Sequence, residues 1–353
     1  MLGVDLTACW RPRVGMVTVS LELARALERR GVPLTLFVSR ERPPGLNGSA
    51  VVLSPHRHEV ANKLGWLPKV ESTAGLDAVL YPYWPPPPRR RPCAPPALAF
   101  IHDLAYRVRP DEVPWQQRLY LGSLVPPALR HAAAVLVPSA ATRDDLLREY
   151  PFQGLDERVE VVPEGAVELP AAAALPVGLD AGFVLAVGTV EPRKNYGRLV
   201  AAFLQVRRRL GDGAPQLVIA GRQGWGGPRT APVPGVVHLE HVSDSLLRTL
   251  YENAAVLAFP SFYEGFGLPL LEAMQFGVPA VIGNRGALPE LGGGAALEVE
   301  PEDVSALAAA LERLLGDGAL RKQLATKGRR RAKQFTWDGA AARIEALLGK
   351  LVA

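Results

Sequence analysis

The chain lacks the features that mark several protein classes. Cysteine is scarce, since Cys9 and Cys93 are the only two in 353 residues and they form no CxxC pair. That number supports no disulfide framework and fits a reducing compartment. No run of 18 or more apolar residues occurs, so no transmembrane helix is predicted. Leu2–Thr7 has the pattern of a strand instead of a secretory leader. We therefore expect a cytoplasmic protein, with peripheral attachment to the inner face of the membrane as an alternative.

Three ligand-binding motifs are missing as well. The sequence contains neither a Walker A motif nor GxGxxG, which disfavours the common NTPase and dinucleotide-binding classes. It also has no Asp-x-Asp, the usual carboxylate pair that holds a divalent ion on a nucleotide sugar. We accordingly expect that the protein needs no metal and no other cofactor.

The charge balance is only weakly basic. Lys and Arg number 40 against 35 Asp and Glu, which gives a net charge of +5. The excess is spread along both halves, whereas nucleic-acid-binding proteins concentrate it on one face or tail. We expect no nucleic-acid partner. Weak attraction to an anionic membrane surface, which would help a soluble enzyme to meet a lipid-linked substrate, stays open.

Short apolar runs alternate with helical patterns along the chain, which predicts parallel sheets covered by helices on both faces. Strands are expected in the first half near Leu2–Thr7, Leu34–Ser39, Val51–Ser54, Ala78–Tyr81, Ala97–His102, Ala134–Pro138 and Val159–Val162. In the second half they are expected near Phe183–Gly188, Gln216–Ala220, Val236–Leu239, Val256–Phe259 and Ala280–Ile282. The helical patterns cover Val17–Arg30, Gln116–Arg130, Ala141–Arg148, Tyr196–Leu210, Ser243–Ala254, Pro269–Gly277, Val304–Leu315 and Phe335–Ala353.

A Pro- and Ala-rich segment, Leu169–Pro176, stands where the strand–helix alternation restarts, and we interpret it as a linker. The sequence thus predicts one domain over residues 1–169 and a second over residues 177–335, followed by a last helix over residues 336–353. In open parallel sheets, ligands bind outside the carboxyl ends of the strands. A cleft between two such sheets is therefore the expected substrate site.

The most informative segment is FPSFYEGFGLPLLEAM, Phe259–Met274. It has the pattern of a strand, a glycine turn and a helix. Gly265 and Gly267 would let backbone amides approach a ligand closely. The amides at a helix N-terminus form a ready site for a diphosphate, and Glu264 and Glu272 would flank it. A helix-entry turn in which Glu272 merely complements the helix dipole is the structural alternative.

A second segment, GTVEPRKN (Gly188–Asn195), follows the first strand of the second half. Arg193 and Lys194 precede a helix for which Asn195 is the predicted N-cap. Cations at a helix N-terminus are unfavourable unless an anion lies between them, so this segment also predicts a phosphate site. Surface charge after a turn is the alternative.

Two weaker candidates lie in the first half. His102 follows the strand that begins at Ala97, where a histidine is as often packed as catalytic. Gly15 opens a helix after the loop Arg11–Met16.

Together these segments resemble the family-4, or group 1, retaining glycosyltransferases, which have the GT-B fold. The resemblance covers nearly the whole chain. It is most specific at EGFGLPLLEAM, GVPAVIGNRGALPEL, GTVEPRKN and IHDL, and at the C-terminal FTW (Phe335–Trp337). It implies two Rossmann-like domains facing each other across a cleft, with the last helix crossing back to the first domain.

The resemblance also implies roles for individual residues. Arg193 and Lys194 would neutralise the departing diphosphate. Glu264 would hold hydroxyls of the transferred sugar, and Glu272 would bind the ribose. His102 would face the sugar at the reaction centre. The donor site is further expected to include Gly15, Gly188, Thr189, Val242, Gly265, Phe266, Gly267 and Leu268.

Three positions depart from the family pattern. Val17 and Thr18 stand where many relatives carry a second glycine and a basic residue, which puts phosphate or acceptor contacts there in question. Thr189 replaces an arginine of some relatives, and Glu164 replaces the usual asparagine of a PNG turn.

We therefore expect a hexosyltransferase, with GDP-mannose as the first candidate donor and a glycan or lipid-linked acceptor in surface polysaccharide synthesis. UDP-glucose is the nearest rival donor. A non-catalytic nucleotide-sugar-binding scaffold is the main alternative from another class, motivated by Val17 and Thr18. An epimerase or phosphorylase of the same fold is a weaker one.

Overall fold

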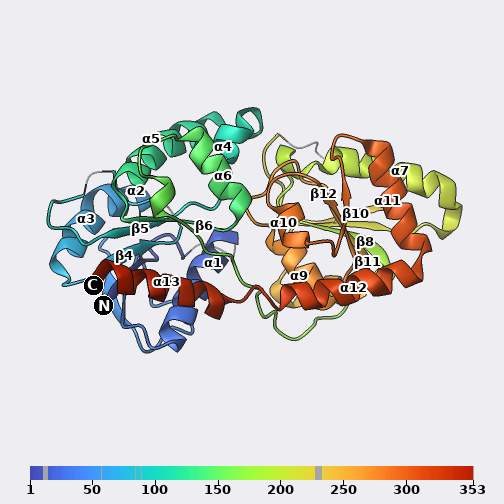
Figure 1. The fold of residues 1–353 in the computed structure, drawn as a ribbon. Helices are drawn as coiled ribbons and strands as arrows, with labels where there is room; N and C mark the ends of the chain where they lie inside the picture. Colours follow the sequence, from blue (N-terminus) through green and yellow to red (C-terminus); the bar gives the residue numbers. More distant parts are fainter. Residues whose placement is uncertain (11–14, 57, 84, 89, 227–232, 353) are drawn as a thin grey trace. The chain divides into compact units, whose positions relative to one another are not determined.

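The computed structural model describes residues 1–10, 15–56, 58–83, 85–88, 90–226 and 233–352. The chain divides into two compact units (Figure 1). Unit 1 comprises Met1–Val108, Trp115–Gly165 and Phe335–Ala353, and unit 2 comprises Arg109–Pro114 and Ala166–Gln334. The short segment Arg109–Pro114 thus groups with unit 2, although the sequence places it in the first domain.

Unit 1 is built on one sheet of parallel strands in the order β3-β2-β1-β4-β5-β6-β7. In this order β1 lies beside β4, so the chain reverses its winding direction between these two strands. The strands are β1 (Leu2–Asp5), β2 (Leu34–Val38), β3 (Ala50–Leu53), β4 (Ala78–Tyr81), β5 (Ala97–Phe100), β6 (Ala134–Val137) and β7 (Val159–Val161).

The main helices of unit 1 are α1 (Gly15–Arg29), α5 (Trp115–His131), α6 (Ala140–Glu149) and α13 (Trp337–Val352). Shorter ones are α2 (Glu59–Ala61), α3 (Leu67–Val70) and α4 (Ala105–Val108), together with the π-helical turn η1 (Asn62–Trp66) and the 3-10 turns η2 (Glu71–Thr73) and η4 (Asp156–Arg158).

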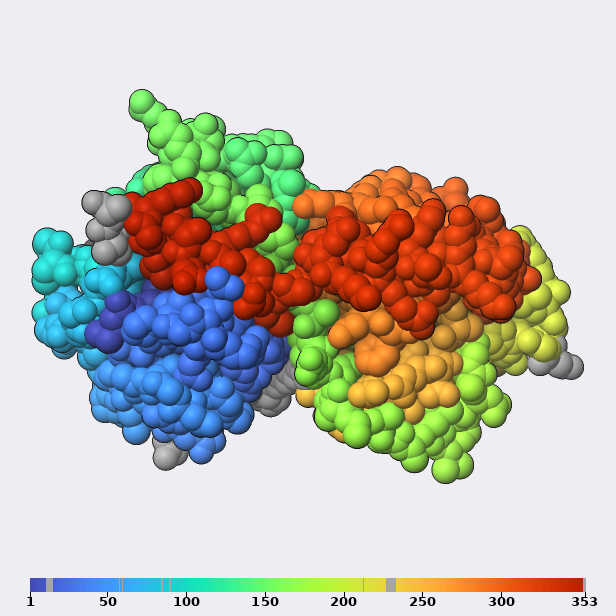
Figure 2. Space-filling view, turned by 60° about the horizontal axis from the view of Figure 1, so that its bottom comes forward, coloured from blue at the N-terminus to red at the C-terminus, as the bar shows by residue number. Residues whose placement is uncertain are grey.

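The last helix, α13, returns to unit 1 and lies along α1, as the red and blue segments show in Figure 2. It buries Trp337, Ala341 and Ile344. Arg30, which directly follows α1, pairs with Asp338 and Glu345 at the surface of α13. Because exposed ion pairs contribute little, apolar burial is what holds α13 in place. The predicted return of this helix is confirmed.

Unit 2 is a second parallel sheet, in the order β10-β9-β8-β11-β12-β13, with the same reversal between β8 and β11. Its strands are β8 (Phe183–Val187), β9 (Leu217–Ala220), β10 (Val236–Leu239), β11 (Ala254–Phe259), β12 (Ala280–Gly283) and β13 (Leu297–Val299). Its helices are α7 (Tyr196–Leu210), α8 (Asp244–Asn253), α9 (Leu268–Phe276), α10 (Leu288–Gly292), α11 (Val304–Gly316) and α12 (Gly318–Ala332), with 3-10 turns η3 (Pro110–Glu112), η5 (Pro192–Lys194) and η6 (Gly211–Gly213).

Burial explains why these strands are nearly continuous apolar runs. Every residue of β8, β9 and β12 is buried, as is every residue of β1, β4, β5 and β6 in unit 1. Strands covered by helices on both faces require this composition. Among the described residues, no helix has both the length and the apolarity needed to cross a membrane.

Candidate active site

The two loops that the sequence singled out in the second half begin at neighbouring strands. One follows β8 and carries Arg193 and Lys194, and the other follows β11 and carries Glu264. Since β8 and β11 pair in parallel at the reversal of strand order, both loops leave the same edge of the sheet at its switch point. This is the position at which doubly wound sheets bind ligands.

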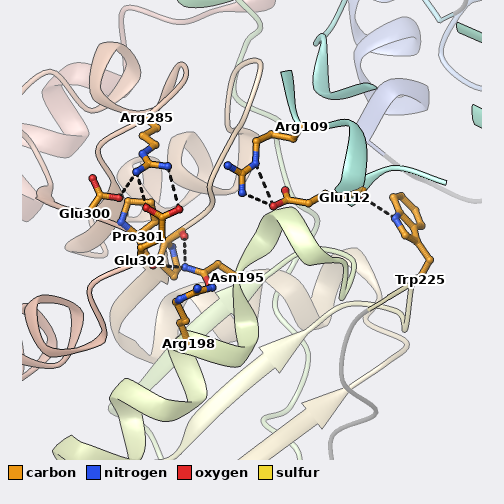
Figure 3. A network of polar contacts seen from close by, with 10 residues as sticks. Arg109, Glu112, Asn195, Arg198, Trp225, Arg285, Glu300, Pro301 and Glu302 are labelled. Carbon is orange, nitrogen blue, oxygen red and sulfur yellow. Dashed lines mark hydrogen bonds and ion pairs between the residues drawn. The ribbon is translucent and has the colours of Figure 1, made fainter. Parts of the chain in front are cut away.

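Asn195 ties these loops together through its side chain (Figure 3). Its Nδ2 donates to the carbonyl of Pro260 at 3.1 Å and to that of Pro301 at 2.6 Å. In addition, the backbone N–H of Phe262 donates to the carbonyl of Arg193 at 2.8 Å. Asn195 does occupy the N-cap position of α7, but it makes no side-chain cap hydrogen bond and adopts a left-handed conformation with φ of 60°. The predicted N-cap position is therefore confirmed, but the side-chain amide does not cap the helix, because it joins the loops that follow β8, β11 and β13.

The three charged residues meet in a compact cluster. Arg193 Nη1 lies 2.8 Å from Glu264 Oε2, and Lys194 Nζ lies 2.7 Å from Glu264 Oε1. Arg193 Nε also lies 2.5 Å from Glu191 Oε1. The side chains of Lys194 and Glu264 are each 8% exposed and that of Arg193 is 19% exposed, so solvent screens these interactions weakly.

Mutual compensation sets the protonation states of this cluster. Burial disfavours the ionised carboxylate of Glu264, but Arg193 and Lys194 outweigh that effect and lower the pKa of Glu264 to about 2. Burial also lowers the pKa of Lys194, and nearby Arg193 acts in the same direction, while Glu264 favours the charged amine. The result is two cations held beside two carboxylates.

The cations at the start of α7 were expected to need an anionic ligand, because an anion is required to stabilise them at a helix N-terminus. The protein supplies such anions itself, as Glu264 and Glu191. The pairing partner could not be identified from the segment Gly188–Asn195 alone, because Glu264 lies 70 residues further along the chain.

Glu272 belongs to α9, which follows the Glu264 loop, and it has a separate partner. The hydroxyl of Tyr251 donates to Glu272 Oε2 at 2.8 Å, and Tyr251 stacks on Phe276 with ring centroids 5.6 Å apart. Tyr251 is buried, and burial together with the neighbouring carboxylate raises its pKa well above the ordinary value. It therefore remains a hydrogen-bond donor to Glu272. Tyr251 was not predicted as a site residue, because it lies in an amphipathic helix without any motif.

The glycines of the two loops allow close packing. Gly188 has φ of 134°, and a Cβ there would lie 3.3 Å from Lys194 Cε. Gly267, the N-cap of α9, has φ of 113°, and a Cβ would lie 2.8 Å from Leu288 Cδ2. Both conformations disfavour any other residue.

The remaining expected donor-site residues of unit 2 are all buried or half-buried. Gly265 and Phe266 are buried in the Glu264 loop, and Leu268 is half-buried as the first residue of α9. Thr189 is half-buried directly after Gly188, and Val242 is half-buried between β10 and α8.

In unit 1, His102 lies just after β5, and both of its ring nitrogens have protein partners. Nε2 lies 2.6 Å from the carbonyl of Pro82, which follows β4, and Nδ1 lies 3.2 Å from Glu164 Oε1, which follows β7. The ring of Phe100 stacks on the imidazole at 4.6 Å. Burial lowers the pKa of His102. The hydrogen bond to Glu164 and the charge of that carboxylate raise the pKa by more than burial lowers it, so the pKa is raised overall.

Gly15 opens α1, and residues 11–14 of the preceding loop lie outside the described residues. Val17 and Thr18 are both buried in the first turns of α1. Val17 packs with Ala8 and Tyr83. The apolar residue at position 17 thus fills a small core cluster.

A further set of contacts, which was not apparent from sequence, joins the segment Arg109–Pro114 to the rest of unit 2, and Figure 3 shows Arg109, Glu112 and Trp225 of this set. The guanidinium of Arg109 lies 4.7 Å from the ring centroid of Phe262, and the indole N–H of Trp225 donates to the carbonyl of Glu112 at 2.9 Å. These contacts explain why Arg109–Pro114 groups with unit 2.

Two family models match the chain, one in each half. A model described as "Glycosyltransferase Family 4" matches residues 14–167, and one described as "Glycosyl transferases group 1" matches residues 181–317. The chain belongs to glycosyltransferase family 4. Its molecular activity is therefore glycosyl transfer.

Named relatives agree with this assignment. The chain is 32% identical to O-antigen chain mannosyltransferase B of Escherichia coli over 260 residues, which covers 69% of this chain and 67% of the relative. It is also 32% identical to the MMP alpha-(1->4)-mannosyltransferase of Mycolicibacterium hassiacum, over 64% of this chain and 56% of the relative. A D-inositol 3-phosphate glycosyltransferase of Salinispora tropica is 30% identical over 59% of this chain and 45% of the relative.

Solved structures share the fold over the whole chain. Sucrose-phosphate synthase from Thermosynechococcus elongatus superposes with a TM-score of 0.75 at 21% identity, covering 99% of this chain and 98% of that one. Anabaena HepE, solved in complex with UDP and glucose, superposes with a TM-score of 0.74 at 18% identity and 99% coverage of both chains. The predicted GT-B class, with two Rossmann-like parallel sheets, is confirmed.

Proposed function

We propose that this glycosyltransferase is a retaining hexosyltransferase that takes its sugar from a nucleotide-diphosphate donor. The cluster of Arg193, Lys194 and Glu264 at the switch point of unit 2 carries the proposal. It combines cations, which suit a diphosphate, with a carboxylate, which suits sugar hydroxyls. The donor diphosphate would partly take over from Glu264 as the partner of the two cations.

The reaction would proceed by cleavage of the bond between sugar C1 and the diphosphate oxygen, with the electron pair leaving on the diphosphate. The acceptor hydroxyl oxygen would form the new bond to C1 on the same face, and its proton would pass to the departing phosphate oxygen. Arg193 and Lys194 would stabilise the negative charge that develops on the leaving group. Because side-chain cations perform this task, we propose that no metal is needed.

Further roles follow from position. Glu264, released from part of its ion pairing, would accept hydrogen bonds from hydroxyls of the transferred sugar. Glu272, oriented by Tyr251, would bind the ribose diol. Backbone amides at the start of α9 would line the diphosphate. His102 and Gly15 of unit 1 would also act in the transfer.

GDP-mannose is the first candidate donor, because two of the relatives described above are mannosyltransferases. UDP-glucose is the rival donor, since HepE, which is 18% identical to this chain, has been solved in complex with UDP-glucose. The acceptor would be a glycan or a lipid-linked glycan of surface polysaccharide synthesis.

The test is to incubate the protein with GDP-mannose, UDP-glucose and other nucleotide sugars, and to measure nucleotide release with and without EDTA. We expect release from GDP-mannose that EDTA does not reduce. Arg193→Ala should lower this rate about 10²–10³-fold through lost charge stabilisation. Arg208→Ala, which removes an exposed arginine of α7, is the matched control. Nucleotide binding without release from any donor would contradict the enzyme proposal and favour the scaffold alternative.

We also propose weak peripheral association with an anionic membrane surface. Trp115 and Leu119 on α5 are 66% and 68% exposed, and Arg118 beside them is exposed too. A face with an aromatic residue, an aliphatic residue and a cation suits a lipid–water interface. Trp115→Ser with Leu119→Ser should reduce sedimentation with vesicles containing phosphatidylglycerol, whereas Leu210→Ser on α7 should not. Equal sedimentation of all three proteins would contradict the proposal.

A further inference from the structure

Glu164, the residue that departs from the family's PNG turn, is buried against His102. The side chain of Glu164 is 6% exposed and that of His102 is 13% exposed. The two residues approach from different strands, Glu164 from the end of β7 and His102 from the end of β5. The stacked ring of Phe100 fixes the plane of the imidazole between them.

The hydrogen-bond partners determine where the protons lie. The carbonyl of Pro82 can only accept, so the imidazole must carry a proton on Nε2, 2.6 Å away. When Glu164 is ionised, its carboxylate also only accepts, so Nδ1 then carries a proton as well. A histidine with both nitrogens protonated is an imidazolium, and it has no lone pair left to accept another proton.

We propose that Glu164 is a positioning residue that clamps His102 as an imidazolium between its own carboxylate and the Pro82 carbonyl, so that His102 acts in sugar transfer as a fixed group and not as a proton acceptor. The role in transfer rests on the proposed function, whereas the clamp is a property of unit 1 by itself. When the pH rises until Nδ1 loses its proton, a lone pair faces the carboxylate, and the clamp opens.

Among the residues that the structure describes, the charged groups that raise the pKa of His102 are Glu164 and the adjacent Asp103. Asp103 is engaged with the chain, because its Oδ1 accepts from the backbone N–H of Ala105 at 3.0 Å. Glu164, which contacts the ring directly, is therefore the group whose removal should change the titration of His102 most.

The first measurement is NMR titration of the free protein with labelled histidine, using His102→Ala to assign one of its six histidines. We expect the pKa of His102 to lie above that of an ordinary histidine, and to fall by about one unit or more in Glu164→Gln. Glu160→Gln, an exposed glutamate of β7, is the matched control and should leave it unchanged. This measurement needs no donor or acceptor, so it tests the clamp even if no nucleotide sugar is turned over.

The second measurement is the pH profile of kcat. Glutamine at position 164 can donate to a neutral Nδ1 through its amide and so hold the ring without charge. We expect kcat of the native enzyme to decline at the alkaline pH at which Nδ1 loses its proton. Glu164→Gln should keep most activity and should not show this decline. Glu164→Ala should lower kcat about 10–100-fold, with little change in donor KM, because the ring is no longer held.

Two results would overturn the inference. One is a His102 that titrates at or below the ordinary value and does not respond to Glu164→Gln. The other is a pH profile in which Glu164→Gln and the native enzyme share the same alkaline limb. If Glu164 had a purely structural role, its substitution would lower the thermal stability of the protein but would leave the alkaline limb of the pH profile of kcat unchanged.

Discussion

Replacing Glu264 by glutamine removes the carboxylate on which the charge balance of unit 2 depends. The change preserves side-chain size but leaves Arg193 and Lys194 as neighbouring, largely buried cations. Removing one partner of a buried ion pair costs about 3–5 kcal/mol. Because Glu191 still pairs with Arg193, we expect the lower end of that range. For a domain of about 150–250 residues, each kcal/mol shifts Tm by about 2–4 °C, which gives a loss of roughly 6–12 °C.

Scanning calorimetry with and without inorganic pyrophosphate measures this effect. Pyrophosphate can supply the missing negative charge, so it should raise Tm more in Glu264→Gln than in the native protein. Glu252→Gln is the control, because Glu252 forms an exposed pair with Arg248 in α8. Loss of such a pair costs about 0.5 kcal/mol.

The pH dependence gives an independent check. The pKa of Glu264 in the folded protein is lowered from 4.5 to about 2. Its stabilising contribution is therefore complete above pH 4.5 and is lost as the pH falls toward 2. The difference in Tm between the native protein and Glu264→Gln should shrink over that interval. The reasoning is refuted if the two proteins melt together at neutral pH, or if pyrophosphate stabilises both equally.

Three further outcomes are expected. Asn195→Gly keeps the left-handed backbone but removes the amide that joins three loops, so it should raise donor KM several-fold in steady-state assays. Asn195→Ala should in addition lower Tm, because alanine disfavours the left-handed backbone. Gly165→Ala places a Cβ 2.3 Å from the backbone nitrogen of Trp337 and should destabilise unit 1 by several kcal/mol in denaturant titrations. Tyr251→Phe should weaken binding of a nucleoside diphosphate about 5–10-fold in calorimetry, because Glu272 loses a hydrogen bond that orients it. Binding of the 2′,3′-dideoxy analogue should stay unchanged, because that analogue lacks the ribose diol.

Most of the fold could be predicted because the strands are buried on both faces. Such strands are short apolar runs between glycine- or proline-containing loops, and β4, β10 and α7 match the predicted ranges at both ends. The elements that were missed lack this signal. β13 has three residues, of which one is exposed, and α12 is rich in basic residues with a weak apolar stripe. The turns of Glu59–Thr73 mix helix types and have no single period.

The candidate site was predictable where one segment contains the whole structural unit. The Glu264 loop and the start of α9 are contiguous in sequence, and so are Arg193, Lys194 and the start of α7. What could not be predicted are pairings across the sheet. The ion pairs of Glu264 join residues about 70 apart, and Glu164 meets His102 across 62 residues. Sequence periodicity reports burial and local geometry, but it does not report which side chains of different loops touch.

The contact between Gly165 and Trp337 connects the start of α13 with the pair of Glu164 and His102. Gly165 follows Glu164 directly, and the absence of a Cβ lets the backbone at the start of α13 lie against it. The same short segment therefore holds the first turn of the C-terminal helix on one side and the imidazole of His102 on the other. A substitution that displaces α13 must shift residue 165, and a shift there moves the Glu164 carboxylate relative to Nδ1. Since hydrogen-bond strength depends steeply on geometry, Gly165→Ala should lower the pKa of His102 as well as the stability of unit 1.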